Sequence, residues 1–270
     1  MVRRRLLAPQ DVHDAVSRRG LPGQARPAHR PRPAHDRQGL RLRQTSRCTR
    51  SGHAGAARGG RGDPVTDHFD LDRQDGILTV RTHTDGGPAR WSRDLLAAWV
   101  RLLGEIAADR TTEVLIVTGT GDAWLGGVDA ASFATPPSAW TSDEVDEQYS
   151  NGVKLLERMI VDIDVPTIGA INGPGFRLEL PLLCDLTLAT PDVRIGDGNF
   201  TAGSAPGDGL YLILRELVGV KRATGIVYTG ATLTAAEAEA LGLIARGWQT
   251  AILPDLRHAY AHQLLTMTSQ

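Results

Sequence analysis

The sequence is short of the residues that mark several common classes of protein. Its 270 residues include two cysteines, Cys48 and Cys184, which are too few for a disulfide framework or a cysteine-rich zinc site. No apolar run approaches the roughly eighteen residues of a membrane-spanning helix, and no G-x-G-x-x-G follows a strand pattern to bind a dinucleotide. We therefore expect a cytoplasmic protein that holds no metal and has no membrane partner.

The first part of the chain also lacks aromatic residues and nearly lacks acidic ones. Residues 1–64 contain fifteen Arg and four Asp, with no Lys or Glu, for a net charge of +11, whereas the rest of the chain sums to −12. No Phe, Trp or Tyr precedes Phe69. Such a segment cannot bury enough apolar surface to offset the entropy of ordering its chain. We expect residues 1–64 to be a disordered, dispensable extension and residues 65–270 to form one domain.

Three origins are open for this extension. A basic segment is typical of an arm that binds nucleic acid, and an Arg-rich, acid-poor one is typical of a transit peptide. The third origin is a translated upstream stretch, with the natural start near Val65. Because the arginines are scattered among Pro and Gly and form no helical stripe, we favour the third and expect no nucleic-acid partner.

From Val65 onward, strand and helix patterns alternate. Continuous apolar runs predict buried strands at residues 77–83, 114–118, 167–171 and 186–190. Residues 151–162 are amphipathic, and residues 210–218 also have a helical pattern. Ser92 is placed to cap a helix whose apolar stripe includes Trp99, and Thr234 caps a later helix in a capping box with Glu237. The alternation predicts an α/β fold with a mainly parallel sheet covered by helices.

Four segments, in this order and spacing, resemble the crotonase (enoyl-CoA hydratase/isomerase) superfamily. They are residues 114–129, residues 165–174 continuing to Cys184 and Asp185, residues 195–209, and residues 229–243. The resemblance covers residues 69–244 and implies the superfamily's ββα superhelix. It also implies an enzyme that acts on a small-molecule carbonyl substrate, needs no cofactor of its own, and assembles as a homotrimer or hexamer.

The resemblance implies an oxyanion hole built from two backbone N–H groups. Those groups belong to Gly126 and Phe176. Removing one such donor typically slows a reaction about 100- to 1,000-fold. The alternative for Gly126 and Gly127 is a tight turn that closes a strand.

The same resemblance places the first catalytic carboxylate of the hydratases at Glu179 and their second at Asn199. An amide cannot exchange protons near neutral pH, so the two-carboxylate mechanism is incomplete here. Glu179 could instead serve only as a first-turn acid against its helix dipole. Residues 83–92 and the bulky loop at residues 176–178 also depart from the pattern that holds coenzyme A. We expect weak or no coenzyme A binding, although a coenzyme A thioester remains an alternative substrate.

Residues 83–92, 129–140 and 206–209 are similar to the 6-oxocamphor hydrolase-like branch, which cleaves a C–C bond in cyclic β-diketones without coenzyme A. This similarity implies a catalytic Asp208 beside Glu179 in one pocket, and substrate contacts from Trp91, Arg177 and Asn199. Asn199 and Arg177 stand where that branch has histidines. Asp208 must therefore act on water directly or pair with Arg177. Ordinary structural roles compete with these assignments, since Trp91 could be core and Asp208 could shape a turn.

Three functions thus stay open. We prefer hydrolytic C–C cleavage of a β-diketone over an enoyl-CoA hydratase or isomerase acting on an acyl-CoA. The third is a catalytically inactive crotonase-fold subunit, suggested by Asn199, Arg177 and a short C-terminus. Because the chain stops soon after residues 256–265, we expect an apolar face to be left uncovered.

Overall fold

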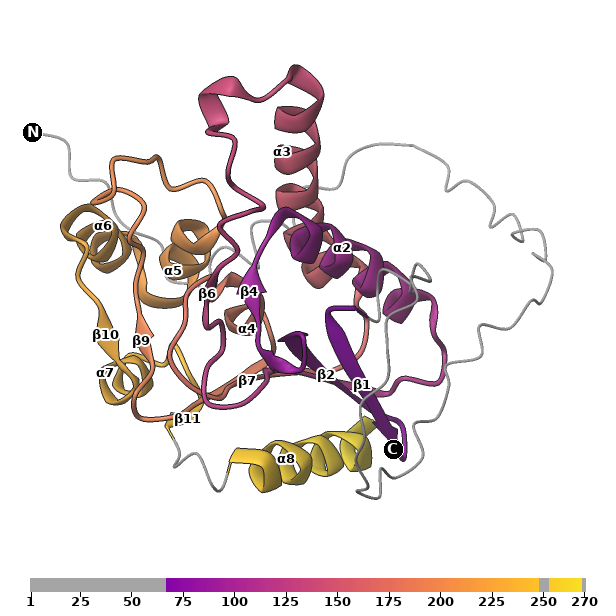
Figure 1. Ribbon diagram of the computed structural model, residues 1–270. Coiled ribbons are helices and arrows are strands. Elements are labelled where there is room, and N and C mark those ends of the chain that lie inside the picture. Colours follow the sequence, from indigo (N-terminus) through magenta and orange to yellow (C-terminus); the bar gives the residue numbers. More distant parts are fainter. Residues whose placement is uncertain (1–66, 248–252, 269–270) are drawn as a thin grey trace, which may run out of the picture. The chain divides into compact units, whose positions relative to one another are not determined.

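The structure is a computed structural model that describes residues 67–247 and 253–268. The extension expected at residues 1–64 lies outside the described residues, so the domain boundary stays a prediction. The described part is built on a seven-stranded sheet in the order β1-β2-β5-β7-β8-β11, with β3 beside β2 (Figure 1). The strands are β1 (Phe69–Gln74), β2 (Ile77–Thr84), β3 (Gly87–Pro88), β5 (Val114–Gly119), β7 (Thr167–Ile171), β8 (Leu186–Ala189) and β11 (Arg246–Gly247).

The sheet is mainly parallel, as the sequence predicts. Strands β2, β5, β7, β8 and β11 run parallel to one another, whereas β1 and β3 each pair with β2 in the antiparallel direction. Residues of each central strand alternate between two apolar clusters, because successive side chains point to opposite faces. In β5, for example, Leu115 and Val117 enter one cluster while Val114 and Ile116 enter the other. Both faces are therefore buried, which explains the unbroken apolar runs.

Helices α2 (Arg93–Ala108) and α3 (Ser142–Glu157) pack together on one side of the sheet (Figure 1). The hydroxyl of Ser92 caps α2 by accepting a hydrogen bond of 2.9 Å from the Leu95 N–H, as predicted. Helix α3 begins at a capping box of Thr141 and Glu144 and ends in a short π-turn, η2 (Arg158–Asp162). The sequence pattern had suggested one amphipathic helix over residues 151–162, so the helix starts earlier than predicted. The turn η1 (Pro137–Ala139) precedes α3.

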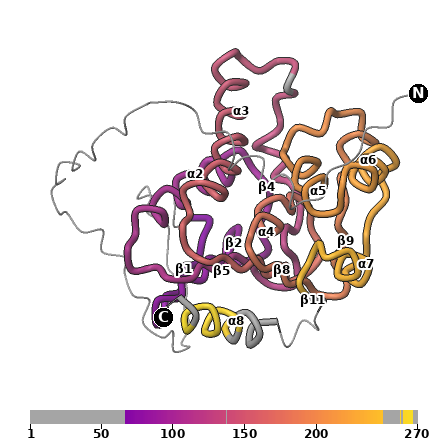
Figure 2. The backbone as a smooth tube through the Cα atoms, turned by 180° about the vertical axis from the view of Figure 1, so that it is seen from behind, coloured from indigo at the N-terminus to yellow at the C-terminus, as the bar shows by residue number. Residues whose placement is uncertain are grey.

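A group of short elements lies beside the sheet in the second half of the chain (Figure 2). Helix α5 has the predicted bounds, and Thr234 with Glu237 forms the predicted capping box at the start of α7. This group comprises β9 (Arg194–Ile195), α5 (Leu210–Val218), α6 (Val220–Thr229), β10 (Leu233–Thr234) and α7 (Ala235–Ala240).

The last helix, α8 (Leu253–Thr268), covers the second face of the sheet. Its Ala261 is fully buried in the smaller apolar cluster, and Tyr260, Leu264 and Leu265 pack against that cluster. Figure 1 shows α8 on the opposite side of the sheet from α2. The expectation of an uncovered apolar face is therefore wrong for this face of the sheet.

Candidate active site

The candidate site lies where β5 and β7 end, at the same edge of the sheet. Two loops leave these neighbouring parallel strands, and Asn172 ties them together. Its amide oxygen accepts from the Gly119 N–H at 3.0 Å, and its amide nitrogen donates to the Gly121 and Ala123 carbonyls at 2.9 and 3.1 Å. The loops approach so closely that a Cβ on Gly173 would lie 1.9 Å from the Asp122 carbonyl oxygen. Glycine is therefore required there.

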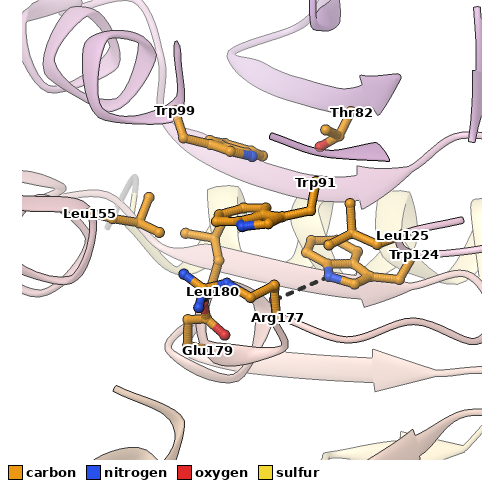
Figure 3. A pocket seen from close by; sticks show the side chains of 9 residues that line it. All are labelled: Thr82, Trp91, Trp99, Trp124, Leu125, Leu155, Arg177, Glu179 and Leu180. Carbon is orange, nitrogen blue, oxygen red and sulfur yellow. Dashed lines mark hydrogen bonds and ion pairs between the residues drawn. The ribbon is translucent and has the colours of Figure 1, made fainter. Parts of the chain in front are cut away.

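Trp124 adds two further links between the loops. Its N–H donates to the Pro174 carbonyl at 3.0 Å, and its indole Nε1 donates to the Arg177 carbonyl at 3.2 Å (Figure 3). The second loop then enters the one-turn helix α4 (Glu179–Leu182). These links fix the backbone on which Arg177 and Glu179 stand.

A small pocket opens between the two loops, β2 and α2. The free space at its centre is about 10 Å³, roughly room for one water molecule. Apolar and aromatic side chains make up most of its wall, and the charged groups are an arginine and a glutamate (Figure 3). The lining residues are Thr82, Trp91, Trp99, Trp124, Leu125, Leu155, Arg177, Glu179 and Leu180.

Arg177 is the side chain that links the charged groups of the site. Its guanidinium carbon lies 4.3 Å from the centre of the Trp91 ring, in a cation–π contact. Its Nη1 is 3.0 Å from Asp208 Oδ2, and its Nε is 2.8 Å from Glu179 Oε1. Of the two alternatives that the sequence leaves for Asp208, the structure shows the pair with Arg177. The backbone of Arg177 has a φ of 57°, a left-handed conformation that is uncommon for a residue other than glycine.

Glu179 is the carboxyl group of the pocket wall. Its side chain is 1% exposed, and neither carboxylate oxygen has a hydrogen-bond partner among the described residues. Burial raises the pKa of Glu179 from 4.5 to about 7; Arg177 opposes this shift, whereas Asp208 and Asp197 add to it. Glu179 therefore exists in both protonation states near neutral pH, which suits proton transfer.

Asp208 lies just before α5 and reaches the pocket through Arg177. Its Oδ2 accepts a hydrogen bond of 3.0 Å from the amide of Asn199, and its Oδ1 accepts one of 3.4 Å from the Leu210 N–H. Its side chain is 15% exposed, so it does not point to bulk solvent. Asp208 and Asn199 are not among the residues that line the pocket, however. The structure thus brings the two carboxylates together around one guanidinium rather than around one open cavity.

The two backbone N–H groups predicted for the oxyanion hole differ in whether they already donate a hydrogen bond. The Gly126 N–H donates to the Ala89 carbonyl at 2.8 Å, where β4 (Arg90–Trp91) pairs with β6 (Gly127–Val128). The Gly126 N–H is therefore engaged in this structure, and its role as an oxyanion donor stays a prediction. The Phe176 N–H, in contrast, has no hydrogen-bond acceptor within residues 67–247 and 253–268.

Sequence reasoning missed Asp197 and two of the tryptophans. Asp197 is 3% exposed; its Oδ1 accepts from the Asn199 N–H at 2.8 Å, and its Oδ2 has no partner among the described residues. Trp99 and Trp124 line the pocket together with Trp91. Trp99 was assigned to the apolar stripe of a helix and Trp124 to the run that resembles the family, so neither carried a separate signal.

Within the described ranges, no group of three His, Cys, Asp or Glu side chains is placed to hold a metal ion. No helix in the same part of the chain is long and apolar enough to cross a membrane.

Comparisons with known proteins agree with this fold. The family described as enoyl-CoA hydratase/isomerase matches residues 90–268. The 2,3-dehydroadipyl-CoA hydratase of Escherichia coli is 29% identical over 196 residues, covering 72% of each chain. The crotonyl-CoA hydratase of Syntrophomonas wolfei is 32% identical over 153 residues, 55% of this chain and 57% of the relative.

Among solved structures, a β-diketone hydrolase from the cyanobacterium Anabaena, bound to (S)-3-oxocyclohexyl acetic acid, is similar with a TM-score of 0.68. It is 29% identical, and the match covers 76% of this chain and 82% of that one. The enoyl-CoA hydratase of Bacillus anthracis has a TM-score of 0.66 at 25% identity, covering 73% of this chain and 76% of that one. The chain belongs to the enoyl-CoA hydratase/isomerase family, and with it to the crotonase superfamily.

Proposed function

We propose that the protein cleaves a C–C bond of a small β-diketone by hydrolysis, through an enolate whose oxygen the site stabilises. The observation that carries the proposal is the pair of unlike carboxyl groups, Glu179 and Asp208, held by Arg177 beside the Trp91 ring. Carboxyl groups whose environments differ take different roles in acid–base catalysis. The reaction needs no cofactor.

Each carboxyl group has one role in the proposed reaction. The carboxylate of Asp208 is held by contacts from Arg177, Asn199 and the Leu210 N–H. It takes a proton from water as the water oxygen bonds to one carbonyl carbon of the substrate. The C–C bond to the central carbon then breaks, which leaves a carboxylic acid and an enolate. Glu179, whose pKa of about 7 keeps it partly protonated at neutral pH, gives its proton to the enolate carbon. The two carboxyl groups then exchange a proton with solvent to restore the starting state.

Two further features support a small substrate over a coenzyme A thioester. Three tryptophans and three leucines leave little room in the pocket, and the Arg177 side chain narrows it further. The similar Anabaena protein is a β-diketone hydrolase, and its bound ligand is a keto acid, the kind of product that this reaction makes. Because the closed pocket holds about one water, the pocket must widen to admit a substrate.

Hydration or isomerisation of an acyl-CoA is the second candidate. The family match and the two hydratase relatives favour it. Asn199 disfavours it, because its amide occupies the place of the second carboxylate that a hydratase needs and instead donates to Asp208.

A mass-shift screen separates these candidates. Purified protein is incubated with a set of cyclic β-diketones and a set of short enoyl-CoA esters, and products are identified by mass spectrometry and NMR. We expect ring-opened keto acids from at least one diketone. Hydration of an enoyl-CoA without diketone cleavage would overturn the proposal, and no turnover of either set would favour an inactive subunit. Calorimetric titration with acetyl-CoA should show no micromolar binding.

We further propose that the protein assembles as a homotrimer or hexamer. Helices α5 and α6 expose large apolar side chains, which a partner copy would cover: Leu212, Leu217, Val220 and Tyr228. Light scattering of the purified protein should give a mass of three or six chains, and a monodisperse monomer would contradict this.

A further inference from the structure

Two residues of the pocket wall carry buried atoms that have no hydrogen-bond partner among the described residues. These atoms are Arg177 Nε and both carboxylate oxygens of Glu179. Buried polar atoms in folded proteins are nearly always paired, because an unpaired one loses its water without compensation. Unpaired atoms gathered at one pocket therefore indicate a place where a ligand supplies the missing partners.

The Nε–H of Arg177 is the donor of this set. Its nitrogen lies 2.8 Å from Glu179 Oε1, yet the N–H does not point at that oxygen well enough to form a hydrogen bond. The other end of the same guanidinium is held by Asp208 at 3.0 Å and by the face of the Trp91 ring at 4.3 Å. Arg177 is thus fixed at one end and has an unused charged donor at the other.

Of the two backbone N–H groups that the resemblance implies for an oxyanion hole, one already donates a hydrogen bond in this structure. The Gly126 N–H is engaged with the Ala89 carbonyl, which leaves the Phe176 N–H. We propose that the Arg177 guanidinium takes the place of the second backbone donor and binds the substrate oxyanion through Nε–H. This inference deepens the proposed function and rests on it for the origin of the oxyanion.

The charges of the site fit an added oxyanion. Arg177 and Asp208 form a pair with no net charge, and Glu179 is neutral when it carries its proton. An oxyanion beside the guanidinium then gains a charge-assisted hydrogen bond in a pocket walled by three tryptophans, where little water screens it. A protonated Glu179 can donate a further hydrogen bond to the same oxygen. Besides its proposed role as the base, Asp208 holds the guanidinium in place, and Asn199 acts as a positioning residue by donating to Asp208.

Phenolate binding tests this inference without knowledge of the substrate. A series of substituted phenols, from phenol to nitrophenol, is titrated into the protein, and absorbance reports the fraction bound as phenolate. We expect the wild type to bind phenolate in preference to phenol and the Arg177→Gln variant to lose that preference by about 100-fold. Arg177→Lys should lose less, because a lysine keeps the charge without the planar fork.

Two controls guard against a merely structural effect. Arg215 also has a buried Nε without a partner and lies over an aromatic ring, Tyr211, but it is outside the pocket. Arg215→Gln should keep the wild-type phenolate preference. Arg177→Gly removes the side chain at a left-handed backbone position that glycine adopts without strain, so it should fold, and added guanidinium should restore its phenolate binding.

The outcomes separate this inference from the proposed function. Unchanged phenolate preference in a folded Arg177→Gln variant, or no phenolate binding by the wild type, overturns the role of Arg177 whatever the protein turns over. Arg177-dependent phenolate binding without cleavage of any diketone supports the oxyanion role and rejects the diketone reaction. The affinity for the phenolate anion, corrected for the ionisation of the free phenol, should also rise as the pH falls through about 7, because Glu179, which faces Arg177, Asp208 and Asp197, then becomes neutral.

Discussion

The two faces of the central sheet use the same strands for different purposes. The face under α8 is closed by apolar residues, with Ala261 buried among aliphatic side chains and Tyr260 packed against them. The face under α2 and α4 ends in the pocket, where Glu179 is buried and Arg177 is half-buried, each with atoms that lack a hydrogen-bond partner among the described residues. The face under α8 therefore serves stability alone. The face under α2 and α4 is less stable than an apolar face would be, because it holds reactive polar groups.

The largest expected effect is on activity at the charged face. Asp208→Asn removes the base while keeping its size, and we expect turnover of the substrate to fall about 100- to 10,000-fold. The control is Asp164→Asn, which removes an exposed Asp–Arg pair of 3.8 Å and should leave turnover unchanged. Steady-state kinetics checks both. Wild-type turnover by Asp208→Asn would return Asp208 to a structural role.

A charge placed on the aliphatic face should cost the most stability. Ala261→Asp buries a carboxylate among aliphatic side chains with no partner, and we expect the free energy of unfolding to fall by about 3 kcal/mol or more. Gln263→Asp, two residues along and exposed on the same helix, should change it by about 0.5 kcal/mol or less. Urea denaturation measures both. Equal effects would show that α8 does not close this face.

Glu179 should make the charged face sensitive to pH. The pKa of Glu179 is about 7 in the folded protein, whereas the ordinary pKa of a glutamate is 4.5. The folded state therefore holds the proton more tightly than the unfolded state does. The stability linked to this proton is present below pH 4.5 and is lost as the pH rises through about 7, a change of about 3 kcal/mol. Glu179→Gln should remove this loss. Denaturation curves of the two proteins between those pH values check it, and parallel pH dependences would count against the raised pKa.

The smallest effect is expected at Phe176, whose side chain is 37% exposed. The site uses its backbone N–H, which an alanine keeps. Phe176→Ala should therefore change the free energy of unfolding by about 0.5 kcal/mol or less and leave kcat near the wild-type value. A large loss of kcat at unchanged KM would show that the aromatic ring, and not the backbone, serves the reaction.

The sequence predicted the sheet better than the site. The apolar run at residues 114–118 became β5, and Leu210–Val218 is a helix with the predicted bounds, because burial and periodicity are local signals. The hydrogen bond from the Gly126 N–H to the Ala89 carbonyl could not be predicted from such local signals. It depends on the pairing of β4 with β6, two strands of two residues that lie far apart in the chain and carry no pattern of their own.

The role of α8 and the position of Arg177 were likewise beyond local patterns. Helix α8 covers a whole face of the sheet, although its own sequence is only weakly amphipathic. Arg177 adopts a left-handed backbone because Trp124 and the Gly173 contact fix the loop around it. The sequence offered the pairing of Arg177 with Asp208 as one alternative, because Arg177 and Asn199 stand where the resembling branch has histidines. The contact of Arg177 with Trp91 depends on how the loop turns.

The Trp124 indole donates a hydrogen bond to the backbone carbonyl of Arg177, so it holds the loop through its backbone and does not depend on which side chain stands at position 177. The peptide at position 177 is held from outside, so replacing the side chain leaves the Phe176 N–H and the Glu179 carboxyl where they are. A single substitution at position 177 therefore replaces the guanidinium by a neutral group or by another basic group while the loop backbone keeps its path. Position 177 is thus a natural starting point for laboratory evolution of new chemistry in this chain.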